Sequence, residues 1–182
     1  MTDQQIFELA STFRTAIVKA RDQGCFTKDL TFWHFPRGCC GDTCDLLAYY
    51  LRSKGINTLY VWGNYGDSTH AWLIVNDSRV KEPTPRFYET PPEIRDILKV
   101  YGGSVSDSPV DVTRYEENDL LNGLIIDITG DQFGQQPVYV GPYNAFYFDI
   151  EFEDAHECGR LSDYRQNELY RKIANHLPTR SY

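Results

Sequence analysis

An aspartate lies inside a strongly apolar segment of this chain. Residues 124–129 read Leu-Ile-Ile-Asp-Ile-Thr, so Asp127 is flanked in sequence by aliphatic side chains. The segment is short, rich in isoleucine and followed by a glycine turn, which predicts a central β-strand. A carboxylate that is buried without a partner is very costly. A fold that places this strand inside must therefore bring a partner group to Asp127.

A histidine in a second apolar strand is the candidate partner. Residues 69–75 read Thr-His-Ala-Trp-Leu-Ile-Val, and His70 shares a strand face with Trp72. On neighbouring antiparallel strands, His70 and Asp127 can lie side by side. Alone, such a histidine is more often a satisfied core residue and such an aspartate a buried turn anchor. Together with a cysteine at a helix start, they favour a catalytic role in which Asp127 accepts the N–H of His70.

The cysteine comes from residues 35–44, which read Phe-Pro-Arg-Gly-Cys-Cys-Gly-Asp-Thr-Cys and lead into a predicted helix. The free N–H groups and the dipole of a helix start favour a thiolate, and a neighbouring imidazole favours it further. Cys40 is the preferred nucleophile, because Gly41 leaves the backbone N–H of Cys40 unobstructed for an oxyanion. Cys39 and Cys44 are the alternatives, and Cys44 is expected to pack under the site.

Two acidic residues oppose this assignment. Asp42 and Asp45 follow Cys40 closely, and their charges would raise the pKa of a nearby thiol. Asp42 could instead cap the helix, which would leave the assignment standing but weaker.

An oxyanion hole needs a second donor besides the backbone N–H of Cys40. The candidate donors are Trp33, Asn64 and Gln132. Chain order alone does not choose among them.

The cysteines do not follow a metal-binding pattern. Cys39 and Cys40 are adjacent, which gives poor tetrahedral geometry, and no second Cys-x-x-Cys pair occurs. No glycine-rich phosphate loop appears either. We expect no metal and no cofactor, and a zinc-binding module is a minor alternative.

The order of the periodic segments predicts an α+β fold. Helical periodicity marks residues 4–22, 42–54 and 161–177. The predicted strands are 56–61, 70–75, 124–129, 137–140 and 145–152, the first two joined by a loose hairpin loop. Helices first and then mostly adjacent strands indicate an antiparallel sheet. Residues 78–122 form a long insertion, in which prolines exclude regular structure until a short helix at 92–101.

Length and composition limit the domain count and the partners. The 182 residues suit one domain spanning 1–182. A net charge of −8 argues against a nucleic-acid partner. No apolar run reaches the roughly 18 residues of a membrane helix, so no membrane partner is expected. Five cysteines and an N-terminus without signal-peptide character indicate a cytoplasmic setting, with signal-less secretion as the alternative.

These motifs resemble the transglutaminase-like branch of the papain-like cysteine hydrolase superfamily. Gly-Cys-Cys-Gly-Asp is similar to the family's nucleophile helix, Thr-His-Ala-Trp-Leu to its histidine strand and Ile-Asp-Ile-Thr to its aspartate strand. The resemblance covers residues 35–135. It implies a nucleophile helix packed on an antiparallel sheet, with Cys40 as nucleophile, His70 as base and acid, and Asp127 as orienting carboxylate. The doubled cysteine and the long stretch between the histidine and aspartate strands depart from the family pattern.

We therefore expect a cysteine hydrolase that acts through a thioester on an amide bond of a protein or peptide substrate, as a peptidase, amidase or glutamine deamidase. The alternatives are a transglutaminase, an acyltransferase of the arylamine N-acetyltransferase kind, or a non-catalytic binding module. The insertion is the predicted substrate-binding wall, with Phe87, Tyr88 and Tyr101 as its contact residues. The sequence does not indicate an oligomeric state.

Overall fold

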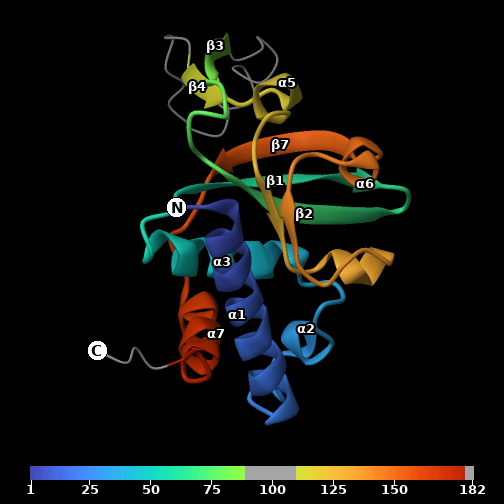
Figure 1. Cartoon of the computed structure of the whole chain (residues 1–182), viewed down its shortest axis with the longest axis vertical. Coiled ribbons are helices and arrows are strands. Elements are labelled where there is room, and N and C mark those ends of the chain that lie inside the picture. Colours follow the sequence, from blue (N-terminus) through green and yellow to red (C-terminus); the bar gives the residue numbers. More distant parts are fainter. Residues whose placement is uncertain (89–109, 179–182) are drawn as a thin grey trace, which may run out of the picture.

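Five antiparallel strands form the main sheet, and the helices α1, α3 and α7 lie on one side of it (Figure 1). The computed structural model describes residues 1–88 and 110–178, with the backbone alone for 84–88 and 110–113. The strand order is β6-β5-β2-β1-β7, and each neighbouring pair is antiparallel. The chain is therefore α+β with an antiparallel sheet, as its sequence predicts.

The helices of the described residues are α1 (Asp3–Asp22), α2 (Leu30–Trp33), α3 (Cys40–Arg52), α5 (Glu117–Leu120), η1 (Gly130–Phe133), α6 (Ala145–Phe148) and α7 (Tyr164–Ala174). The strands are β1 (Thr58–Tyr65), β2 (Ser68–Val75), β3 (Thr84–Tyr88), β4 (Val110–Arg114), β5 (Ile125–Asp127), β6 (Tyr139–Gly141) and β7 (Glu151–Glu157). No helix among these is long and apolar enough to span a bilayer.

Helix α1 forms where the sequence predicts it. Thr2 and Gln5 make a reciprocal capping box at its start, which satisfies two of the free N–H groups of the first turn. Its buried stripe includes Ile6, Phe13 and Ile17. This stripe packs into the same core as the inner face of α3.

Strand β2 separates two cores because its side chains alternate between the faces of the sheet. Ala71 and Leu73 belong to the core shared with α1, α3 and α7. Trp72 and Ile74 belong to a second core, which also contains Tyr147. Both faces of the central strand are therefore buried, and its ionisable residue is buried with them.

The pairing of β5 with β2 brings the predicted histidine and aspartate strands together. Leu73 pairs with Ile126, and Ile74 pairs with Ile125. The hairpin between β1 and β2 is tighter than the loose loop predicted from the sequence. The strands extend to Tyr65 and from Ser68, so two residues make the turn, and Gly66 supplies its positive φ of 58°.

The strand predicted at 145–152 is wrong. Asn144 caps the short helix α6 there, with its side-chain oxygen accepting the N–H of Phe146 at 2.9 Å, and β7 starts only at Glu151. Alternating aromatic residues suggested a strand, but Phe148 is 57% exposed and does not belong to a sheet face. The cap decided the local structure, and the apolar alternation did not.

The insertion contains more regular structure than its prolines predicted. Strands β3 and β4 pair from Thr84 with Arg114 to Tyr88 with Val110 and form a separate two-stranded sheet. Pro85 is tolerated there because a two-stranded sheet has only edge strands. This sheet lies across the main sheet from α3 in Figure 1. The helix predicted at 92–101 lies outside the described residues.

Replacing Leu46 by alanine should destabilise the protein by about 2–5 kcal/mol, because Leu46 is fully buried in α3 and its loss leaves a cavity. Urea denaturation measures this change in the free energy of unfolding. Leu30→Ala is the matched control, since Leu30 is 76% exposed and its loss should cost less than about 0.5 kcal/mol. Equal losses for the two variants would contradict this packing.

Candidate active site

Cys40 is the first residue of α3, and Cys39 is the N-cap residue without a capping side chain. Cys40 is half-buried, whereas Cys39 and Cys44 are buried in the core. Burial raises the pKa of Cys39 to about 12 and also raises the pKa of Cys44. A helix start and partial exposure thus distinguish Cys40 from its two neighbours.

Gly41 has a packing role that the sequence did not reveal. A Cβ atom at this position would lie 2.9 Å from the hydroxyl oxygen of Tyr60, closer than real contacts allow. Tyr60 belongs to β1 and packs against the first turn of α3. The glycine therefore lets the start of α3 approach Tyr60 of the sheet.

His70 is completely buried in β2 and makes a hydrogen bond from Nε2 to Oδ2 of Asp127 at 2.8 Å. Its Nδ1 atom is buried and has no well-formed hydrogen bond within the described residues. His70 also interacts with the thiol of Cys40, and Nδ1 is the nitrogen left for that interaction.

Asp127 has three hydrogen-bond donors besides His70. The N–H of Thr129 donates to Oδ1 at 2.8 Å, and the hydroxyl of Thr129 lies 3.2 Å from the same oxygen. The hydroxyl of Tyr147 donates to Oδ2 at 3.0 Å, beside the bond from His70. Every one of these groups is buried. The carboxylate has the partners that its position in an apolar strand requires.

Gly130 makes room for this carboxylate. A Cβ atom on Gly130 would lie 2.8 Å from Oδ2 of Asp127. That oxygen accepts the bonds of both His70 and Tyr147. A larger residue at position 130 would therefore push on the oxygen that orients the imidazole.

The three ionisable groups shift one another's pKa. Burial alone would raise the pKa of Cys40, but the nearby imidazole of His70 and the backbone of Ala71 and Gly41 lower it overall. Burial alone would lower the pKa of His70, but Asp127 and Cys40 raise it to about 9. Burial would raise the pKa of Asp127, and His70 with its other donors keeps it below the ordinary range. The arrangement favours a thiolate, an imidazolium and a carboxylate together.

The two acidic residues that opposed this assignment have partners from α7. Asp42 does not cap α3; it forms an ion pair with Arg165 at 2.9 Å, and the same guanidinium pairs with Asp29 at 2.8 Å. Asp45 accepts a hydrogen bond from Gln166 at 2.9 Å. Pairing with Arg165 offsets the charge of Asp42 near Cys40.

Of the three predicted oxyanion donors, Gln132 is the one tied to the cysteine loop. Its Oε1 accepts the N–H of Gly38 at 3.2 Å, and its Nε2 donates to the carbonyl of Thr129 at 3.1 Å. The amide of Asn64 donates to Glu153 of β7. Trp33 ends α2 and is 45% exposed. Gln132 retains a second amide hydrogen, and its role as an oxyanion donor stays a prediction.

The predicted substrate-binding residues are not brought to Cys40 by the described part of the chain. Phe87 and Tyr88 lie in β3, across the main sheet from α3, where the structure gives the backbone only. Tyr101 lies outside the described residues. Their role in binding stays a prediction.

Sequence reasoning missed Tyr147, Gly130 and Arg165. Tyr147 was assigned to a strand that does not exist, so its direction toward Asp127 was not apparent. Arg165 lies 123 positions from Asp42, and only tertiary structure pairs them. In the part of the chain that is described, no group of three or more histidine, cysteine or acidic side chains could hold a metal ion.

Comparison with known proteins adds no relative to this picture. No family model, curated protein or solved structure matches this chain. The resemblance to transglutaminase-like hydrolases therefore remains a prediction from its motifs.

Tyr147→Phe should lower the free energy of unfolding by about 1–3 kcal/mol, because it removes a buried hydrogen bond to a charged group. The ring and its packing are retained, so urea denaturation reports mainly on the hydroxyl. Tyr164→Phe is the control, since Tyr164 is 81% exposed and should show almost no change. A neutral Tyr147→Phe would contradict the bond.

An NMR titration of the imidazole protons should show that His70 loses its proton near pH 9 in the folded protein. Since this pKa lies above the ordinary value of 6.5, the charge of His70 contributes its full stabilisation of the fold only below about pH 6.5. The contribution is then lost as pH rises through about 9. Asp127→Asn should lower the midpoint. A midpoint near 6.5 in the unaltered protein would contradict this ion pair.

Proposed function

We propose that this chain is a cysteine hydrolase that cleaves or deamidates amide bonds through a thioester. The observation that carries the proposal is the buried bond from His70 Nε2 to Asp127, which leaves the other side of the imidazole for the Cys40 thiol. The resemblance of the motifs to transglutaminase-like hydrolases supports the same chemistry.

In this mechanism, the thiolate of Cys40 attacks the carbonyl carbon of the substrate amide. The negative charge that develops on the carbonyl oxygen is stabilised by N–H groups at the start of α3, with Gln132 as the candidate second donor. The imidazolium of His70 then donates its proton to the departing nitrogen, and the C–N bond breaks. An amide nitrogen leaves poorly without a proton, so an imidazolium that persists at neutral pH suits this bond.

The thioester that results is released by water. Neutral His70 takes a proton from the attacking water, the C–S bond breaks and the thiolate returns. Asp127 holds the imidazole ring in one orientation during both steps and stabilises its charged form. We favour water over an amine as acceptor because hydrolysis requires no second binding site, and a protein or peptide is the proposed substrate.

The acidic surroundings of Cys40 had favoured a non-catalytic binding module. In the folded chain, the guanidinium of Arg165 pairs with Asp42, so that objection loses weight. A buried histidine–aspartate pair is also an expensive feature for a surface that only binds. These two observations favour the enzyme over the binding module.

Iodoacetamide labelling of the native protein near pH 6, followed by peptide mapping, tests this proposal. Cys40 should label first, because its lowered pKa gives it a larger thiolate fraction than an ordinary thiol has. Cys25 is an internal comparison because it also lies beside a histidine, with its sulfur 3.8 Å from Nε2 of His176. The rate at Cys40 should fall at least roughly tenfold in His70→Ala.

His34→Ala is the matched control, because His34 is an exposed residue at the end of α2. It should leave the labelling rate of Cys40 unchanged. Slow and equal labelling of several cysteines, unaffected by His70→Ala, would overturn the catalytic assignment. Once the thiolate is established, glutamine-containing peptides separate the two reactions. Deamidation would release ammonia, whereas cleavage would create new amino termini. Cys40→Ser is the inactive control.

A further inference from the structure

A polar cavity lies along α3, and its lining does not include Cys40, His70 or Asp127. Its volume is about 430 Å³, which is within the range of small-molecule sites. Its walls come from α3, the end of β7, the segment that follows β7 and the first turns of α7. The ionisable side chains on these walls are Asp45, Arg52, His156, Glu157 and Arg160.

The carboxylate of Asp45 is held in a fixed orientation on one wall. Gln166 is buried, and its Oε1 accepts the N–H of Ser162 at 2.8 Å and the hydroxyl of Ser162 at 3.1 Å. These bonds fix the amide, so that Nε2 donates to Oδ2 of Asp45 at 2.9 Å. Within the described residues, no group donates a hydrogen bond to the other carboxylate oxygen, Oδ1, so this oxygen is available for a ligand. Asp45 is half-buried, which makes a bare charge there costly.

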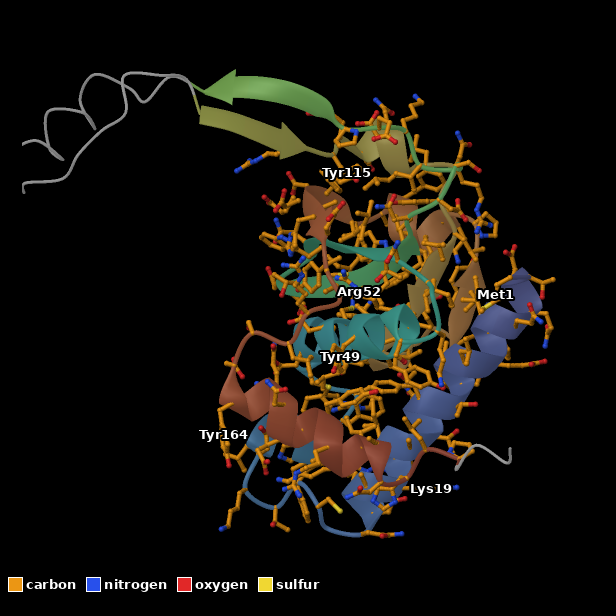
Figure 2. The ribbon with its side chains drawn as sticks, turned by 90° about the vertical axis from the view of Figure 1, so that its left-hand side faces the viewer. Met1, Lys19, Tyr49, Arg52, Tyr115 and Tyr164 are labelled. Carbon is orange, nitrogen blue, oxygen red and sulfur yellow. The ribbon has the colours of Figure 1, made fainter. Side chains whose placement is uncertain are left out.

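Arg52 and Arg160 line the same cavity, and the backbone beside Arg160 packs on the stem of Arg52. A Cβ atom on Gly159 would lie 3.3 Å from Cδ of Arg52 and 3.3 Å from the carbonyl oxygen of Ala48. Gly159 also has a φ of +97°, so a glycine lets this segment lie directly on α3. The backbone of Arg160 therefore lies beside the side chain of Arg52. Arg52 is labelled on the face of the molecule shown in Figure 2.

The opposite charges on these walls do not neutralise one another. Within residues 1–88 and 110–178, neither arginine nor Asp45 takes part in any ion pair. His156 stacks on Tyr60 at 5.0 Å and lies 3.5 Å from Asp154, and it shares the cavity wall with Asp45 without forming an ion pair to it. A held carboxylate and two guanidinium groups thus line one cavity with a gap between them.

We propose that this cavity binds a small zwitterion of the amino-acid type. The ammonium group would bind Oδ1 of Asp45, and the carboxylate would bind Arg52 and Arg160, whose guanidinium groups match carboxylate geometry. A simple anion fits less well, because Asp45 and Glu157 would repel it. A simple cation would in turn be repelled by the two arginines. The site is separate from the proposed catalytic centre and does not depend on it.

Isothermal titration of the full chain with each of the twenty common L-amino acids tests this site. At least one should bind saturably, and its N-acetyl and methyl-ester derivatives should bind at least roughly tenfold more weakly, because each removes one charge. Asp45→Asn and Arg52→Gln should each weaken binding by a similar factor. Arg171→Gln is the control, since Arg171 is exposed on α7 outside the cavity, and it should bind normally.

Arg52 and Arg160 are exposed, so their glutamine variants should fold normally even if Asp45→Asn does not. Failure of all twenty amino acids to bind would overturn the proposal. Binding that survives Arg52→Gln combined with Arg160→Gln, or that persists in both capped derivatives, would overturn it as well. None of these outcomes bears on the labelling of Cys40, so the two proposals fail separately.

Discussion

The hydrogen bond between His70 and Asp127 is the interaction on which the rest of the structure depends. Both side chains are removed from water, so neither charge is tolerable without the other. The pairing of β2 with β5 places them on neighbouring strands. Thr129 and Tyr147 then complete the bonding of the carboxylate. This buried polar pair therefore stabilises the arrangement in which β2 and β5 lie side by side.

Several contacts connect the loop before α3 with the end of β5, the strand that carries Asp127. Arg14 of α1 donates to the carbonyl of Ile128 and pairs with Asp131 just after β5, while its guanidinium lies 5.0 Å from the ring centre of Phe35. Gln132 joins the same end of β5 to Gly38. The loop that carries the thiol is therefore attached to the strand that carries the carboxylate. Such support keeps reacting groups close to a productive geometry.

The sequence allowed prediction of the residues whose chemistry is unusual for their position. Asp127 stood out because an acid in an apolar strand requires a partner, and Cys40 because it precedes a helix. Tyr147 could not be found in this way, since an asparagine cap converted its segment from strand to helix. Arg165 gave no signal either, because a surface arginine can pair with any acid that the fold brings near. Local sequence patterns thus identify residues whose burial or charge requires a partner. Only the tertiary structure identifies the partners.

The strands that carry His70 and Asp127 are joined by the long insertion, yet its two ends meet. The N–H of Val75 donates to the carbonyl of Leu124 at 2.9 Å, and the N–H of Lys81 donates to the carbonyl of Asp119 at 3.0 Å. The sheet itself therefore closes the loop, and lengthening a closed loop adds little entropic cost. A change in the number of residues between Lys81 and Asp119 would therefore leave the strands that carry the imidazole and the carboxylate paired as they are.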